Sequence, residues 1–207
     1  MEGYMINIET TLPEGYRQVL KIDAADKKTG MLLTVACLAV TALLVTLSLI
    51  PLGFSLSLSP DSTTAVAMAV FVIGMFAYVV LHELTHGVAY KLLTKRRLTF
   101  GFKWSCACCG VPDVFVYRRA SIIALAAPLA LFTVLLAPLA VALFFVSEAL
   151  YFATALLFAY HLGGCVGDGY MLILLLFKYK NKDILIKDTG PVQYIYERIS
   201  ANEKEKR

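Results

Sequence analysis

Four long hydrophobic segments limit the folds open to this chain more than any other feature. They cover residues 31–50, about 64–90, about 121–146 and about 149–177. A helix that crosses a bilayer needs about 20 predominantly apolar residues, and each segment is long enough. Hydrophobic residues make up 59% of the chain, whereas roughly 45–50% is usual for a soluble domain. Too little polar surface remains to cover four core helices, so we expect a mainly α-helical integral membrane protein with four transmembrane helices.

The basic residues predict the orientation of these helices. All 19 Lys and Arg residues lie within residues 17–28, 91–119 and 178–207, and the other two connections contain none. Basic residues of short loops stay on the cytoplasmic side during insertion. We therefore expect a multi-pass protein of the cell membrane with both termini in the cytoplasm. The expected organisation is a cytoplasmic lead-in over residues 1–30, a four-helix membrane domain over residues 31–177 and a cytoplasmic tail over residues 178–207.

Short local patterns predict the elements between and after the helices. LTFGFKW and VFVYRR are rich in aromatic and β-branched residues, and the turn-forming CGVPD lies between them. This pattern predicts a small cytoplasmic β-hairpin between the second and third helices. The GGCVGDG cluster predicts a break in the fourth helix, which is tolerable only where the backbone faces protein or a water-filled cavity. The tail predicts two short strands around a Thr-Gly-Pro turn.

Three cysteines lie within the predicted hairpin region, in the CACC stretch: Cys106, Cys108 and Cys109. The cytoplasm is reducing, so we do not expect disulfides there. The stretch lacks the paired C-x-x-C spacing of a zinc site. We interpret these cysteines as small loop residues, although metal binding and lipid attachment remain alternatives.

The LHELTHG stretch, residues 81–87, carries the strongest chemical signal of the chain. His82 and His86 are four residues apart, so on a helix they project from one face about one turn apart. That spacing suits two imidazoles that bind one zinc ion, with Glu83 as the general base for a water molecule. The alternative is a pair of hydrogen-bonded histidines at a helix end, which leaves the glutamate unexplained.

The other ionisable residues of the hydrophobic segments fit the same interpretation. Apart from Glu148 at the outer boundary, the histidines and acidic residues within the segments are His82, Glu83, His86, His161 and Asp168. Ionisable groups inside a bilayer are costly and usually paired or functional. No basic residue within the segments can neutralise the two carboxylates. A divalent cation would do so.

The depth in the membrane favours Asp168 as the third ligand. At about 1.5 Å per residue, His86 and His82 lie roughly 8 and 14 Å from the Lys91 end of the second helix. Asp168 lies roughly 15 Å from Lys178 by the same count, and His161 lies roughly 25 Å away. Gly167 and Gly169 would also let another backbone approach Asp168 closely. His161 is then a candidate for the shell around the ligands, with a hydrogen-bonded interior histidine as the alternative.

These motifs resemble those of known membrane zincins. HELTHG at the end of a membrane helix, a following hairpin, a proline-bearing helix and an Asp in a Gly-rich break resemble the site-2 protease type of membrane zincin. More closely, LPEGY, HELTHG, CVGDG and the KDTG and YIYE pieces of the tail are similar to a family of bacterial membrane proteins described as putative zincin peptidases. The resemblance implies one Zn²⁺ on His82, His86 and Asp168, with Glu83 as the base. The chain differs from site-2 proteases in lacking an Asn-Pro-Asp-Gly type motif, since Gly167 precedes Asp168.

We therefore expect a zinc-dependent endopeptidase that hydrolyses a membrane-embedded or membrane-proximal peptide bond. The alternative is a non-catalytic membrane protein, either a metal-binding scaffold or a transporter. A transporter would favour inverted repeats and paired broken helices, and the sequence shows one break and no repeat. The expected partners are a protein substrate and the lipid bilayer, with no nucleic acid. The sequence does not indicate an oligomeric state.

Overall fold

The computed structural model describes residues 8–54, 60–103 and 106–199, which form a mainly helical chain with small antiparallel sheets. The chain divides into two compact units that do not follow chain order. The first unit comprises Met1–Met31, Glu83–Ala127 and Asp168–Arg207, and the second unit comprises Leu32–His82 and Pro128–Gly167.

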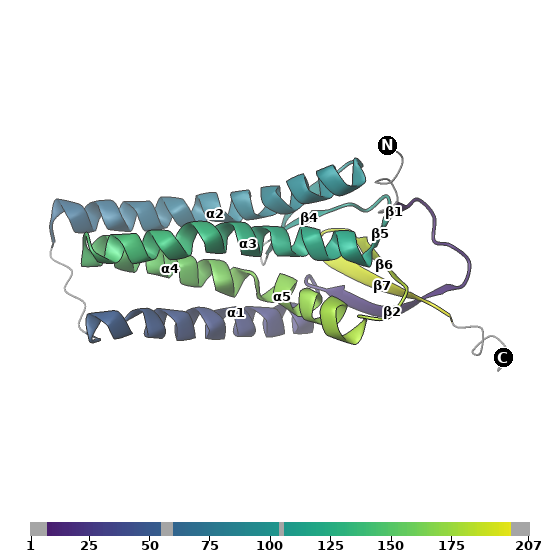
Figure 1. Ribbon diagram of the computed structural model, residues 1–207, viewed down its shortest axis with the longest axis horizontal. Coiled ribbons are helices and arrows are strands. Elements are labelled where there is room, and N and C mark those ends of the chain that lie inside the picture. The colour runs from purple at the N-terminus through teal and green to yellow at the C-terminus, as the bar shows by residue number, and fades with distance from the viewer. Residues whose placement is uncertain (1–7, 55–59, 104–105, 200–207) are drawn as a thin grey trace. The chain divides into compact units, whose positions relative to one another are not determined.

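The four predicted hydrophobic helices are present, and the fourth is broken as predicted (Figure 1). Its two parts meet at Cys165, inside the GGCVGDG cluster, and the pair is bent by 44° there. The helices are α1 (Lys27–Ser48), α2 (Ser62–Thr94), α3 (Arg118–Phe144), α4 (Glu148–Gly164) and α5 (Val166–Ile173), with a short 3₁₀ helix η1 (Ile50–Leu52) and a π-helical turn η2 (Leu174–Lys178).

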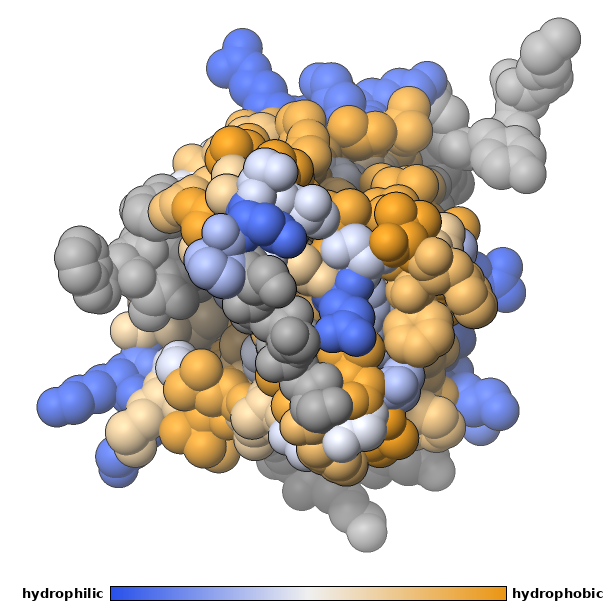
Figure 2. Space-filling model, turned by 90° about the vertical axis from the view of Figure 1, so that its left-hand side faces the viewer, coloured by the Kyte–Doolittle hydropathy of each residue, from blue (hydrophilic) through white to orange (hydrophobic). Residues whose placement is uncertain are grey.

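Three helices within the described residues are long and apolar enough to cross a membrane: Lys27–Leu52, Ser62–Thr94 and Arg118–Phe144. A fourth candidate is the bent pair of α4 with the helix that follows its break. Large apolar side chains on these helices are exposed, for example Leu32 at 69%, Ile73 at 70% and Val134 at 70%. The face drawn in Figure 2 is likewise hydrophobic over much of its area. Such helices are compatible with a lipid environment.

Small and aromatic side chains pack the helices of the second unit. Ala67 of α2 lies against Ala149 and Ala153 of α4 in one buried cluster. Tyr78 of α2 packs against Phe132 of α3 in a second cluster. Small residues let helix backbones approach closely, which is how helices associate when the surrounding solvent is itself apolar.

In the same unit, α1 and α4 approach each other closely at a glycine. A Cβ added at Gly163 of α4 would contact the Thr41 side chain and lie 3.0 Å from the carbonyl oxygen of Cys37. Only glycine leaves room for this contact. By contrast, a Cβ at Gly167 or Gly169 would meet nothing within 4 Å. Our expectation that these two glycines admit another backbone beside Asp168 is therefore wrong, and the close approach lies earlier, at Gly163.

The first unit contains a five-stranded antiparallel sheet in the order β1-β5-β6-β7-β2. Its tail strands, β6 and β7, confirm the prediction of two strands around a Thr-Gly-Pro turn, in which Gly190 has a left-handed φ of 94°. Strand β2, which the sequence patterns did not predict, lies in the N-terminal segment and pairs with β7. The strands are β1 (Ile8–Glu9), β2 (Tyr16–Asp23), β5 (Phe115–Tyr117), β6 (Ile184–Asp188) and β7 (Val192–Arg198).

The predicted hairpin between α2 and α3 is present, but its second strand differs from the prediction. Strand β3 (Thr99–Lys103) pairs with β4 (Cys106–Gly110), which is the CACCG stretch that we interpreted as loop residues. The VFVY piece forms β5 instead and joins the larger sheet between β1 and β6. The reason is packing, because Val114 and Val116 are buried with Tyr90 in the hydrophobic core of the first unit.

Candidate metal centre

Two of the predicted site residues are in direct contact within the first unit. The Nε2 atom of His86, on α2, lies 3.2 Å from Oδ2 of Asp168, in the first turn of α5. The Nδ1 atom of His86 lies 2.9 Å from the backbone carbonyl oxygen of Ala124 on α3. A carbonyl only accepts, so Nδ1 carries the proton and donates it. Nε2 therefore faces Asp168, and because both atoms would otherwise present lone pairs to each other at 3.2 Å, a proton or a metal cation must lie between them.

This arrangement is the one that histidine ligands of metals usually adopt. A ligating imidazole typically donates its other N–H to a carbonyl or carboxylate, which fixes the tautomer and the ring orientation. His86 is 6% exposed and held in that way by Ala124. A divalent cation between Nε2 and the Asp168 carboxylate would match the chemistry of both atoms. The first unit therefore fits a metal at this position.

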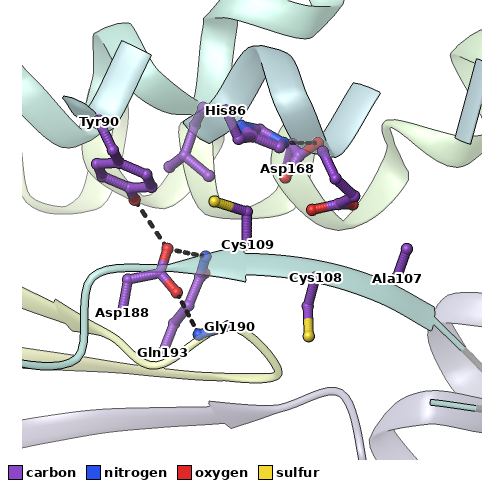
Figure 3. A pocket seen from close by; sticks show the side chains of 11 residues that line it. His86, Tyr90, Ala107, Cys108, Cys109, Asp168, Asp188, Gly190 and Gln193 are labelled. Atoms are coloured by element: carbon purple, nitrogen blue, oxygen red, sulfur yellow. Dashed lines mark hydrogen bonds and ion pairs between the residues drawn. The ribbon is translucent and has the colours of Figure 1, made fainter. Parts of the chain in front are cut away.

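A pocket extends from the His86–Asp168 pair toward strand β4 and the β6–β7 turn (Figure 3). The side chain of Cys109 points from β4 toward the pair, whereas that of Cys108 points to the opposite side of the strand. Glu83 also lines this pocket. The predicted base and the predicted ligands His86 and Asp168 thus border one common space.

Asp188 lies on the far side of the same pocket, and sequence reasoning did not single it out. It is 2% exposed. Its carboxylate accepts hydrogen bonds from the hydroxyl of Tyr90 at 2.8 Å, from Nε2 of Gln193 at 3.1 Å and from the backbone N–H of Gly190 at 2.9 Å. Burial raises the pKa of Asp188 to about 6, although the three hydrogen bonds act in the opposite direction. Asp188 thereby ties the tail to the end of α2.

In the second unit, His82 is joined to His161 through the hydroxyl of Tyr78. The Tyr78 oxygen lies 2.8 Å from Nδ1 of His82 and 3.0 Å from Nδ1 of His161. On its other side, Nε2 of His161 lies 3.1 Å from Oγ1 of Thr133. All three ring-bearing residues are buried, and His161 is fully so at 0% exposed.

His82, His161 and Cys165 also form a group whose potential ligand atoms lie within 4.8 Å of one another. The Tyr78 hydroxyl is hydrogen bonded to both histidines and lies 3.9 Å from the Cys165 sulfur. A hydroxyl group therefore already satisfies these nitrogens, which favours a hydrogen-bond network over a metal ion in the second unit.

One face of α2 carries most of these groups. Tyr78, His82, His86 and Tyr90 follow one another at intervals of four residues, and all four are buried. Residues four apart lie above one another on a helix. The sequence signal that would have found Tyr78 and Tyr90 is the extension of the H-x-x-x-H spacing by one step in each direction.

Comparison with known proteins identifies the family. The model of a family described as "Putative zincin peptidase" matches residues 75–184, which is more than half of the chain. The chain belongs to this family. None of the curated proteins and none of the solved structures matches it. The family description indicates a zinc-dependent peptidase and therefore implies zinc as the metal.

The part of the chain that matches the zincin family contains all five residues singled out from the sequence: His82, Glu83, His86, His161 and Asp168. It also contains Tyr78, and it ends at Ile184, before Asp188. The carboxyl group of Asp188, on the far side of the pocket, thus lies outside the matched region.

The cysteines whose side chains are described form no disulfides: Cys37, Cys108, Cys109 and Cys165. Burial raises the pKa of the Cys109 thiol to about 12, and the nearby carboxylates of Glu83 and Asp188 add to this effect. The thiol is therefore protonated at neutral pH. In the metal-free protein Cys109 therefore presents a neutral S–H group to the pocket.

Proposed function

We propose that this protein is a zinc-dependent membrane endopeptidase of the site-2 protease type. It would hold one Zn²⁺ on His82, His86 and Asp168 and use Glu83 as the general base. The observation that carries the proposal is the His86–Asp168 contact of 3.2 Å, with Nδ1 of His86 donating to the Ala124 carbonyl. This contact joins the H-E-x-x-H helix to the Gly-Asp-Gly break, which are distant in the sequence.

The donor set supports zinc rather than a harder cation. His82 precedes His86 by one turn of the continuous helix α2, so the two rings project from the same face. Two imidazole nitrogens and one carboxylate oxygen are a common ligand set of catalytic zinc sites, which keep a fourth position open. Magnesium and calcium prefer sites built from oxygen atoms.

Each residue of the site would have a separate role in peptide hydrolysis. When bound, zinc supplies a Lewis acid that polarises a carbonyl group and acidifies water. Glu83 would take the proton from the attacking water and return it to the leaving amine nitrogen. Its position next to His82 and on the wall of the pocket supports this role. The imidazole ring of His86 would be held in its orientation by the hydrogen bond to the Ala124 carbonyl.

Strand β4 supports a peptide as the substrate. It pairs with β3 along one edge, and within the described residues no strand pairs with its other edge. Cys109 of this strand faces the pocket. An extended peptide could add to such an edge through main-chain hydrogen bonds, which would present a peptide bond to the pocket. The apolar helices support a substrate that lies within or close to the membrane.

The proposal is tested with the purified protein and two variants, Glu83→Gln and Asp168→Ala. Glu83→Gln is expected to keep its zinc and lose peptide hydrolysis, because the amide cannot act as a base. Asp168→Ala is expected to lose most of its zinc, since it lacks a ligand. Glu148→Gln, a carboxylate-to-amide change in the first turn of α4, serves as the matched control and should resemble the wild type.

Zinc content is measured by elemental analysis and hydrolysis by the appearance of new peptide termini in a membrane-protein substrate mixture. Full hydrolysis by Glu83→Gln would refute the assigned mechanism. Full zinc retention by Asp168→Ala would refute the ligand assignment, whatever the activity.

A further inference from the structure

We propose that Tyr78 is a positioning residue for the metal ligand His82. Its hydroxyl would hold the imidazole of His82 with the proton on Nδ1, so that Nε2 is presented to the metal. This inference rests on the proposed zinc site, and it assigns a function to Tyr78, which belongs to the second unit together with His82.

The ring of Tyr78 is held in place by its neighbours. It is 6% exposed and lies one helical turn before His82 on α2. It packs edge to face against Phe132 and Tyr160, with ring centroids 5.1 and 5.7 Å away. Its hydroxyl therefore has a defined position, 2.8 Å from Nδ1 of His82.

The backbone carbonyl of His161 gives the Tyr78 hydroxyl a partner that can only accept. It lies 3.3 Å from the hydroxyl, and Tyr78 donates to it. A hydroxyl has one proton, so its oxygen then acts as the acceptor toward a ring nitrogen that carries a proton.

The tautomer of His82 follows from this donation. With its proton given to the His161 carbonyl, the Tyr78 oxygen can only accept from Nδ1 of His82, which lies 2.8 Å away. Nδ1 of His82 then carries a proton. Nε2 of His82 is left with a lone pair, which is the form that binds a metal. The opposite direction would place a proton on Nε2 and block the ligand.

The acceptor of the Tyr78 proton does not belong to the His161 side chain. It is the backbone carbonyl of that residue. This carbonyl remains when the His161 side chain is removed, so Tyr78 can still donate its proton and accept from His82. Loss of the hydroxyl, by contrast, leaves His82 without its orienting partner. The structure thus predicts a larger effect for Tyr78→Phe than for His161→Ala.

The experiment measures zinc affinity and the tautomer of His82 in the full-length protein in detergent. Zinc dissociation constants are obtained by competition with a chromogenic chelator. Loss of a hydrogen-bond partner behind a metal ligand typically lowers affinity about 10- to 100-fold. We expect a fall in this range for Tyr78→Phe and a smaller one for His161→Ala. Tyr151→Phe is the matched control, since it removes a hydroxyl that donates to the Ser48 carbonyl in the same unit, and it should bind zinc like the wild type.

The tautomer is read in the metal-free wild-type protein from the side-chain nitrogen shifts of labelled histidine, assigned with His82→Gln. The expected result is a proton on Nδ1 of His82. A proton on Nε2 of His82 would overturn the proposal, as would an unchanged zinc affinity in folded Tyr78→Phe. Neither readout depends on hydrolysis, so the inference can stand if Glu83→Gln disproves the peptidase mechanism, and it can fail while that mechanism holds.

Discussion

Replacing Asp188 with Asn is expected to remove a pH dependence of stability that the buried carboxyl group creates. Asp188 is 2% exposed and accepts hydrogen bonds from Tyr90, Gly190 and Gln193. Burial raises its pKa from 3.8 to about 6, although those hydrogen bonds stabilise the charged form. Loss of hydration therefore outweighs three hydrogen bonds at this site.

The magnitude follows from linkage between protonation and folding. The folded state holds the proton more tightly than the unfolded state, so the stabilisation is fully present below pH 3.8 and is lost as the pH rises through about 6. A tenfold difference in proton affinity corresponds to about 1.4 kcal/mol. The rise in the pKa of Asp188 therefore lowers the free energy of unfolding by about 2 kcal/mol between pH 4 and pH 7, since part of the effect already lies below pH 4.

The assay compares Asp188→Asn with the wild type by equilibrium unfolding in detergent micelles across this pH range. Both proteins are metal-free, because metal ligands must be deprotonated and bound zinc would add its own pH dependence. Asn does not titrate, so the variant should gain about 2 kcal/mol relative to the wild type from pH 4 to pH 7. The control is Asp183→Asn, whose carboxylate is exposed and pairs with Arg198 at the surface. Its difference from the wild type should vary by less than about 1 kcal/mol.

A difference between Asp188→Asn and the wild type that stays constant with pH would refute the reasoning. A variant that becomes relatively less stable as the pH rises would do so more directly. It would show that the hydrogen bonds from Tyr90, Gly190 and Gln193 outweigh the loss of hydration and hold the pKa below its usual value.

Two further predictions concern the membrane topology and the helix packing. In a cysteine-free background, a cysteine at Pro60 should react with a membrane-impermeant reagent added to intact cells, whereas a cysteine at Asn181 should not. The reason is that all basic residues lie in the segments predicted to be cytoplasmic. Labelling at Asn181 would show that the predicted orientation is wrong. Gly163→Ala should lower the free energy of unfolding by about 1–3 kcal/mol, since the added Cβ would meet Thr41 and Cys37 of α1. Gly167→Ala, where a Cβ meets nothing within 4 Å, is the control, and equal stability of the two variants would contradict the packing argument.

The sequence by itself determined the elements whose signal is local. The hydrophobic segments predicted the long helices, and the glycines around Cys165 predicted the break between α4 and α5. The Thr-Gly-Pro turn predicted the β6–β7 pair. The prediction that His82 and His86 project from one face required only the geometry of a single helix. Each of these predictions depends on residues within a few turns of one another, where backbone sterics and hydrophobic length decide the outcome.

Only the tertiary structure decided which distant segments meet. CACCG became a strand because β3 pairs with it, and VFVY left the hairpin because its valines are buried against Tyr90. The hydrogen bond from Tyr90 to Asp188 joins residues 98 positions apart, and the one between Tyr78 and His161 joins residues 83 positions apart. Such contacts leave no periodic trace in the sequence, because they depend on which helix faces and strand edges pack together. The sequence therefore predicted the candidate ligands, whereas the bonds from His86 to Ala124 and between Tyr78 and His161 depend on packing between distant segments.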